Sequence, residues 1–535
     1  MKFQLFNKVW IILIVVAQFP CESLASTILV EDSEYILRIE DVENNLDTSP
    51  ASFIPTTIPD LLKDFACVLI EGRQACSENC QQGKFVDREG CCVCVCRKNF
   101  VKVNERFCET VSWSGWSSWS KCITSQWGGL QTRERICRSS SQEAPGSCVG
   151  IGSNSRTCSP VTGDFRIRKN VRDLTDEEIH DLIQGMTSFK EDSSRRGFRS
   201  IVSWHGWPGE CPWYRRVHQH SDGHCSWHHH PLFLPWHRLI TVQLELGLSR
   251  HLKNKTLGIP FWDWTEHAEN IPFLLQNETI YDPILKKKVH NPFYRTYIRN
   301  FRGIRLYSQR NPWYPGLLMN KYIIKGMVRA LLCHNYEHFD RQEATIPHDQ
   351  IHDCFCIEGG TIEGEQRCRF GMPTVDYAAW DPAFMLHHSA IDRMFVMRRK
   401  IEEEEGMSDW TKSRVIGQYL ERETRHNNFE NSFDFPLSPF CNESLNPESV
   451  TLNEGAWTLR NSYYGEQLFG YKYTDYNMGS NYTWKDLKED YRKNTKDGNF
   501  WNDEFFDTKL GPLTRSNSLL LTRTEGCVME FSNPV

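Results

Sequence analysis

The feature that most constrains this chain is a set of histidines whose spacing fits two metal-binding groups. One group includes His228 and His237, and the other contains His348, His352 and His388. His348 and His352 are four residues apart, so on a helix their imidazoles lie on one face and can share a metal. Neutral imidazole is a good copper ligand, and three nitrogens per metal leave a coordination position free for another ligand. The spacing therefore predicts a pair of metal sites whose ligands suit copper.

The residues around these histidines have helical periodicity. Apolar residues recur every three or four positions over 238–245 and 387–398. Pro347 suits the opening turn of the helix that would carry His348, and a capping box at Thr175–Glu178 predicts another helix start. We expect a mainly α fold in which the metals lie between the helices of a bundle.

A carboxylate and several further histidines lie near the predicted ligands. Asp392 follows His388 by one helical turn, where it can orient an imidazole or a neighbouring arginine. The spacing does not separate copper from zinc, because both metals accept three imidazoles. It also leaves the third ligand of the first group open, since four histidines compete for this role: His205, His218, His220 and His224.

The first 25 residues have the pattern of a secretory signal. A basic start precedes the apolar run 9–17, and small residues follow at 23–25. The run is too short to span a membrane as a helix, and an uncleaved N-terminal anchor is the alternative. The formal net charge of -6 comes without a polybasic tract, which argues against a nucleic-acid partner. We expect a secreted protein with no membrane span.

The use of cysteine agrees with an oxidising compartment. Of the 21 cysteines, Cys21 lies in the predicted signal, which leaves an even number for the mature chain. Residues 26–66 are polar and predict a linker or propeptide. A cysteine-rich module at 67–110 holds enough cysteines for four disulfides, which we favour over a zinc site. Four sequons are compatible with glycosylation, at Asn254, Asn277, Asn442 and Asn481.

Residues 111–160 contain tryptophans at every third position followed by alternating arginines. Trp113, Trp116 and Trp119 can stack with Arg133 and Arg135, so that cation–π attraction holds a thin module that has little core. The segment resembles a thrombospondin type 1 repeat that lacks two of the usual six cysteines. The resemblance implies contact with extracellular matrix or glycan. It also implies two disulfides, Cys122–Cys158 and Cys137–Cys148.

Two longer motifs identify the region from about 166 to 473. Phe-Leu-Pro-Trp-His-Arg ends at Arg238, and Asp-Pro-x-Phe-x-x-His-His-x-x-x-Asp ends at Asp392. Both resemble motifs of the tyrosinase, catechol oxidase and hemocyanin superfamily of type 3 binuclear copper proteins. The resemblance implies a helical copper domain, which we place at 161–480, and a tail at 481–535. It also selects His205, in a His-Gly segment, as the remaining ligand. The implied ligands are His205, His228 and His237 for one copper and His348, His352 and His388 for the other, with His229, His230 and His387 as neighbours that do not bind metal.

The same resemblance implies an activity: oxidation of phenols or catechols by dioxygen at two copper ions. In the family, a glutamate and an asparagine hold a water that accepts the phenol proton. Glu337 matches the glutamate, but Asp349 stands where the asparagine is expected, which puts monophenol hydroxylation in doubt. Phe339, Val375 and Ala378 align with residues that line the substrate pocket.

Three departures from the family pattern carry further expectations. Some relatives link a cysteine to the middle ligand of the first copper, but that position is Ser226 here, so we expect no thioether. A Cys211–Cys225 disulfide is the favoured use of the nearby cysteine. Tyr471–Tyr473 resembles the Tyr-x-Tyr that closes the domain, and too little chain follows for a large shielding domain. If the site is masked, the N-terminal modules are the candidates.

The leading interpretation is a secreted copper oxidase of a small phenol or catechol, or of protein-bound tyrosine or DOPA. Its products would serve melanin formation, matrix crosslinking or an immune deposit, which the residues do not distinguish. One alternative is an oxygen-binding protein like a hemocyanin. The others are a relative that holds zinc and has no oxidase activity, and an adhesion protein whose copper domain is vestigial.

Overall fold

The structure is a computed structural model, which describes part of the chain. The described residues are 2–5, 9–12, 26–29, 36–39, 83–88, 91–96, 100–104, 107–141, 148, 152–208, 225–228, 232–265, 271–299, 305–308, 310, 326–328, 330–331, 344–355, 361–362, 365–366, 370–405, 437–440, 457–478 and 482–497. Within these, no helix is both long and apolar enough to cross a bilayer.

Short strands make up the described N-terminal part. Two antiparallel hairpins are formed by β1 (Lys2–Leu5) with β2 (Val9–Ile12), and by β3 (Ser26–Leu29) with β4 (Ile36–Ile39). In the region of the predicted cysteine-rich module lie β5 (Gly83–Arg88), β6 (Cys91–Cys96), β7 (Phe100–Asn104) and β8 (Phe107–Thr110). Cys108 is disulfide-bonded, which excludes it as a zinc ligand.

Residues 112–159 form the segment that we call the Trp–Arg module. Its strands are β9 (Ser112–Trp113), β10 (Ile123–Ser125), β11 (Gly128–Glu134), β12 (Cys137–Arg138) and β13 (Ser153–Ser159). One antiparallel sheet has the order β10-β11-β13, and β12 pairs with β9. The two expected disulfides, Cys122–Cys158 and Cys137–Cys148, are both present.

The expected ladder of indoles and guanidiniums is present in this module. Arg133 lies 4.7 Å and 4.5 Å from the ring centres of Trp116 and Trp119, and Arg135 lies between Trp113 and Trp116 at similar distances. The serine after each tryptophan accepts a hydrogen bond from a backbone N–H at the other side of the ladder, at 2.8 to 3.0 Å. These bonds set the register of the ladder, so stacking and hydrogen bonding together replace an apolar core.

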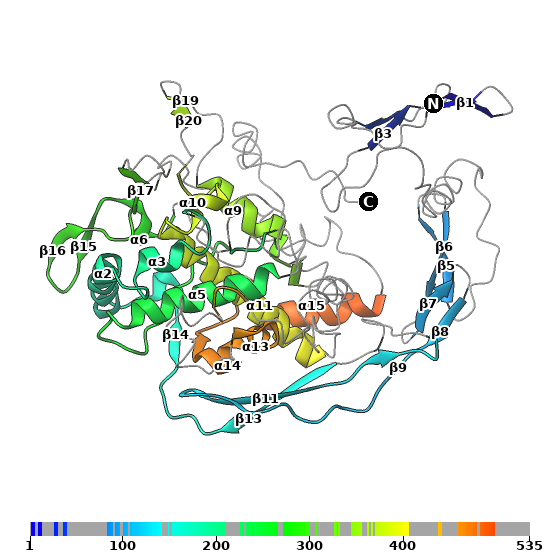
Figure 1. Cartoon of the computed structure of the whole chain (residues 1–535), viewed down its shortest axis with the longest axis horizontal. Helices are drawn as coiled ribbons and strands as arrows, with labels where there is room; N and C mark the ends of the chain where they lie inside the picture. The colour runs from blue at the N-terminus through cyan, green and yellow to red at the C-terminus, as the bar shows by residue number, and fades with distance from the viewer. Residues whose placement is uncertain are drawn as a thin grey trace. The chain divides into compact units, whose positions relative to one another are not determined.

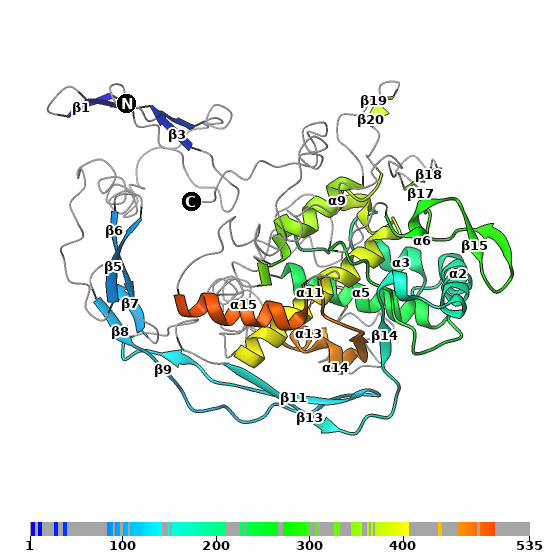
Figure 2. The same ribbon diagram turned by 180° about the vertical axis from the view of Figure 1, so that it is seen from behind.

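Two long helices form the centre of the copper domain. They are α5 (Phe233–Ser249) and α11 (Ala383–Glu405), which pack against each other and lie side by side in both views (Figures 1 and 2). α5 is buried almost throughout, which explains why apolar residues cover more than one of its faces. The helices predicted over 238–245 and 387–398 are therefore confirmed, with longer bounds.

Shorter elements surround this pair. The predicted capping box is present at the start of α2 (Asp176–Glu191), where Thr175 and Glu178 exchange hydrogen bonds. The other helical elements are η1 (Val171–Asp173), α3 (Phe198–Val202), α6 (Phe273–Gln276), η2 (Ala344–Asp349), α9 (Gln350–Cys354), α10 (Val375–Ala378), α13 (Leu459–Tyr463), α14 (Gly465–Phe469) and α15 (Trp484–Asp497). Three antiparallel hairpins are formed by β15 (Thr279–Asp282) with β16 (Lys287–His290), β17 (Tyr297–Arg299) with β18 (Arg305–Tyr307), and β19 (Thr361–Ile362) with β20 (Glu365–Gln366).

The two ends of the copper domain are joined by a pair of parallel strands. β14 (Arg166–Arg168) pairs with β21 (Tyr471–Tyr473), with Arg166 opposite Tyr471 and Arg168 opposite Tyr473. The Tyr-x-Tyr segment therefore closes the domain. Of the sequons, Asn254 and Asn277 are exposed, whereas Asn442 and Asn481 lie outside the described residues.

Pro347 lies in the opening turn of the helical segment that carries His348, as predicted. Pro347 is the fourth residue of η2, a π-helical turn that begins at Ala344 and runs into α9. The proline is tolerated, because the first backbone N–H groups of a helix have no acceptor within it. His348 and His352 meet, with ring centres 4.5 Å apart.

Candidate metal centre

Three histidines converge at the start of α5. His237 belongs to this helix, His228 precedes it, and His205 follows α3. Each offers one ring nitrogen, and these nitrogens all lie within 4.8 Å of one another. The Nε2 atoms of His205 and His237 are 3.2 Å apart. The structure therefore brings together the three residues predicted for the first copper, including His205, which spacing alone left open.

Four histidines form the second group: His348 from η2, His352 from α9, and His387 and His388 from α11. Their offered nitrogens also lie within 4.8 Å of one another, and all four residues are buried. The Nε2 atoms of His352 and His388 are 3.2 Å apart. The two groups adjoin, because the rings of His237 and His388 stack with centres 4.7 Å apart.

Hydrogen bonds at Nδ1 orient four of the six predicted ligands. His237 donates to the carbonyl of Phe233 at 2.9 Å, and His205 to that of Val375 at 3.0 Å. His352 donates to the carbonyl of Met372 at 2.7 Å. His348 donates to the carboxylate of Asp349 at 2.8 Å. A ring that donates from Nδ1 keeps the Nε2 lone pair for a metal, so these bonds select the tautomer that binds.

The donor atoms fit a pair of copper ions. His348 Nε2 is buried and has no hydrogen-bond partner in the described part of the chain. In the first group the Nε2 atoms of His205 and His237 face each other, and because both rings donate from Nδ1, neither Nε2 can donate to the other. A soft cation bound by these nitrogens would give His348 Nε2 a partner and would lie between the facing Nε2 atoms. Three imidazoles for each ion leave one coordination position open.

Burial favours the neutral form of three of these imidazoles, those of His237, His352 and His388. It lowers the pKa of His352 to about 3, with a further contribution from His348. Burial, followed by the nearby His228 and His205, lowers the pKa of His237 well below its usual value. The pKa of His388 is lowered in the same way by burial and then by His237. A neutral imidazole is the form that binds a metal.

His387 was expected to be a neighbour that does not bind metal, but the structure places it within the second group. Its ring stacks on His348, with centres 5.4 Å apart, and lies edge-on to His352 at 4.7 Å. The adjacency of His387 and His388 was the only sequence signal that His387 joins this group. It is a weak signal, because adjacent residues of a helix point in directions about 100° apart.

Close backbone packing explains the His-Gly segment. A Cβ on Gly206 would lie 2.3 Å from the carbonyl oxygen of Asp376, so only glycine lets this segment rest on α10. Trp207 N–H donates to the same carbonyl at 2.7 Å. Ser226 donates its hydroxyl to the carbonyl of His205 at 2.6 Å, and so helps to hold this ligand. Cys225 is disulfide-bonded, whereas Cys211, its predicted partner, lies outside the described residues.

The predicted substrate and proton-transfer residues are placed only in part. Glu337 and Phe339 lie outside the described residues. Val375 is 43% exposed and contacts the first group through its carbonyl, but Ala378 is 1% exposed. Asp349, which stands at the position expected for the asparagine, accepts a hydrogen bond from His348.

An Asp349→Ala variant is expected to bind copper about 10- to 100-fold more weakly, because His348 loses the acceptor that fixes its ring. Chelator competition measures this affinity. Asp349→Asn is the matched control and should stay near wild type, since its amide oxygen can accept the same bond. Equal losses in both variants would show that the carboxylate charge, and not the hydrogen bond, matters.

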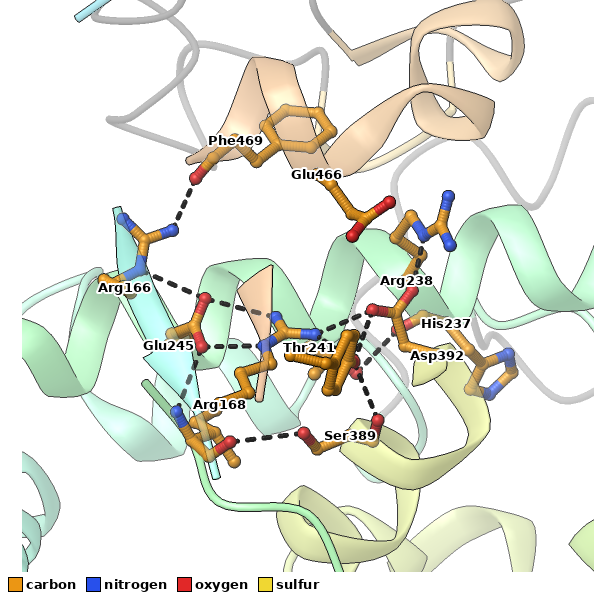
Figure 3. Close-up of polar contacts among 12 residues, drawn as sticks. Arg166, Arg168, His237, Arg238, Thr241, Glu245, Ser389, Asp392, Glu466 and Phe469 are labelled. Carbon is orange, nitrogen blue, oxygen red and sulfur yellow. Dashed lines mark hydrogen bonds and ion pairs between the residues drawn. The ribbon is translucent and has the colours of Figure 1, made fainter. Parts of the chain in front are cut away.

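A buried network of ion pairs lies behind the ligands (Figure 3). Asp392, one turn after His388, pairs with Arg238, the residue after His237, and with Arg168 at 2.8 Å. Arg168 also pairs with Glu245 at 2.8 Å. Asp392 therefore orients arginines, one of the two roles expected for it. The network ties α5, α11 and β14 together.

The charges of this network perturb the pKa values of its acids. Burial would raise the pKa of Asp392, but the nearby Arg238 and Arg168 hold it below its usual value. In the same way, Arg168 and Arg166 outweigh burial and hold the pKa of Glu245 below its usual value. Both acids thus have a lower pKa in the folded state than in the unfolded state.

Acid is therefore expected to destabilise the protein in a defined range. A carboxylate with a depressed folded pKa stabilises above its unfolded pKa, about 3.9 for Asp and 4.3 for Glu, and this stabilisation is lost as the pH falls through the folded pKa. The free energy of unfolding should hold above about pH 5 and fall below about pH 4. Urea titrations at several pH values measure it, with the exposed Glu489→Gln as control. A flat profile down to pH 3 would contradict the expectation.

Comparison with known proteins gives four findings. The model of the common central domain of tyrosinase matches residues 195–401. Hemocyanin 2 of Megathura crenulata is 30% identical over 339 residues, which are 62% of this chain but only 9% of that protein. The hemocyanin 2-c chain of the same organism is 30% identical over 316 residues, covering 58% of this chain and 69% of that one. The solved structure of deoxygenated hemocyanin from Rapana thomasiana has 26% identity and a TM-score of 0.48, and covers 63% of this chain and 75% of that one.

Proposed function

This chain belongs to the type 3 copper family of tyrosinases and hemocyanins, and from this we propose that it is a copper-dependent oxidase of catechols and phenols. The substrate is a small phenolic compound or a tyrosine or DOPA side chain of a protein, and the oxidant is dioxygen. Two catechols and one dioxygen give two o-quinones and two waters. One monophenol and one dioxygen give one o-quinone and one water.

The observation that carries the proposal is a buried ligand set with an accessible margin. The facing Nε2 atoms are buried, but His228 is half-buried, Val375 is 43% exposed, and the Asp349 side chain is 32% exposed. We place the entry of the phenol at this margin. Bound copper supplies the redox chemistry, which is the exchange of electrons between substrate and dioxygen.

The side chains around the metals contribute binding and orientation. Phe233 packs on His237 and His348, with ring centres 4.3 Å and 4.5 Å apart. Phe384 packs on His388 and His205 at 4.0 Å and 4.9 Å. These rings fix the imidazoles from both groups in one arrangement. Asp349 holds His348, and we assign the acceptance of the phenol proton to Glu337 together with Asp349.

A second candidate function is reversible oxygen binding without turnover. It is favoured by one observation, that the relatives reported above carry the name hemocyanin. A zinc-loaded relative without oxidase activity is the other alternative, and the fourth imidazole of the second group would suit a tetrahedral zinc ion.

The deciding experiment is the absorption spectrum of the copper-loaded protein after addition of hydrogen peroxide, with tyrosine and a catechol then added separately. A near-ultraviolet band with quinone from both substrates would establish a tyrosinase, and quinone from the catechol alone a catechol oxidase. A band without any turnover would favour oxygen binding. No band at full copper occupancy would contradict the proposal.

We further propose that the protein acts after secretion and that its quinones enter melanin or crosslinked matrix. The Trp–Arg module would provide contact with matrix or glycan. Pull-down of the whole protein with sulfated and unsulfated polysaccharides tests this contact. Equal recovery on both, at the level of uncoated beads, would contradict it.

A further inference from the structure

A single tryptophan fixes the Trp–Arg module on the copper domain. Trp127 precedes β11, is 5% exposed, and donates its indole N–H to the carbonyl of Asp164 at 3.0 Å. A Cβ on Gly470 would lie 2.1 Å from this ring, so the indole occupies a slot that only glycine leaves open. The guanidinium of Arg166 covers the ring at 4.7 Å from its centre.

Two further contacts extend this interface along the module. Tyr464 donates its hydroxyl to Ser153 at 2.8 Å, and both residues are buried. Arg460 forms an ion pair with Glu134. The contacts join β11, β13 and Trp127 to the segment 460–470 and to Arg166 of β14. Trp127, Ser153 and Tyr464 are all buried, so the interface excludes solvent at more than one point.

The residue that covers Trp127 also enters the buried network. Arg166 pairs with Glu245 at 3.1 Å and donates to the carbonyl of Phe469 at 2.6 Å. From Glu245 the network continues through Arg168 and Asp392 to Arg238, next to His237 (Figure 3). A continuous set of ion pairs thus links the interface with the metal ligands.

We propose that the Trp–Arg module is a permanent part of the copper domain, and that Trp127 is a positioning residue for the metal centre. The indole holds Arg166 in place, and Arg166 holds one end of the network that supports α5 and α11. The module then packs against the copper domain in one fixed position, and does not move relative to it on a flexible linker. This inference does not depend on the proposed oxidase activity, because it concerns only the interface and the retention of metal.

The test compares three variants of the whole chain. Trp127→Ala removes the interface ring, Trp127→Phe keeps an aromatic ring, and Trp119→Ala removes a ring of the same module that stacks between Arg133 and Arg156. Thermal unfolding of the metal-free protein reports the interface. The rate at which a chelator removes copper reports the ligands, and neither measurement requires enzymatic activity.

The wild-type copper domain and module should unfold in one transition. Trp127→Ala should separate the transitions and release copper about tenfold faster, with Trp127→Phe close to wild type. Trp119→Ala should lower the stability of the module but leave copper release unchanged. If Trp127→Ala does not fold, Tyr464→Phe, which removes the bond to Ser153 across the same interface, should lower the midpoint of the single transition. Two independent transitions in the wild type, or wild-type copper release in Trp127→Ala, would overturn the proposal.

Discussion

A His388→Ala variant is expected to lose one copper ion and at least about a thousandfold in oxidation rate, which corresponds to about 4 kcal/mol of transition-state stabilisation. Its Nε2 faces that of His352 at 3.2 Å, so its removal leaves the second copper with two of its three expected ligands. Copper content after gel filtration and the initial rate with a catechol measure the two effects.

His387→Ala is the matched control for this experiment. Both residues are fully buried in α11, so the two substitutions create similar cavities. The ring of His387 stacks on His348, and its loss should cost stability but leave two copper ions bound. If His387→Ala loses copper and His388→Ala retains it, the assignment of the ligand in this pair is wrong.

An Asp392→Ala variant is expected to lower the free energy of unfolding by about 3–5 kcal/mol. The carboxylate is the shared partner of Arg168 and Arg238, whose side chains are at most 1% exposed. Its removal leaves the buried charge of Arg238 without its carboxylate partner, and leaves Arg168 with Glu245 alone. Urea unfolding of the metal-free protein measures the loss. Metal-free protein is preferred, because bound copper would add its own stabilisation.

Glu403→Ala provides the contrast, since Glu403 is 43% exposed and its partner Arg399 keeps a second ion pair with Glu466. Its loss should cost less than about 1 kcal/mol. Similar losses in the two variants would show that solvent reaches Asp392 and that the network is not an essential buried element.

The parts of the fold that the sequence predicts are those whose information is local. His348 and His352 lie one turn apart, and the apolar repeats around His237 and His388 extend over many turns. The Trp–Arg ladder repeats at a fixed spacing, so its stacking could also be predicted. In each case neighbouring residues along the chain are also neighbours in space.

The parts that the sequence does not predict depend on contacts between distant segments. Glu245 meets Arg166 and Arg168 across almost 80 residues, and nothing in either segment specifies this partner. Gly206 is required because of the backbone of Asp376, which is known only once α10 is placed. Both features needed the assembled domain.

The pairing of β14 with β21 has a consequence for the history of such chains. Because Arg166 lies opposite Tyr471, the first and last described strands of the copper domain are neighbours, and α15, which follows β21, packs on the domain beyond them. A domain with adjacent ends can be inserted between other segments, or receive new ones, without rearranging its interior. The slot of Trp127 is at the same place, beside Gly470. A segment joined at the β14–β21 pair would therefore have to fit the surface beside Gly470, as Trp127 does here.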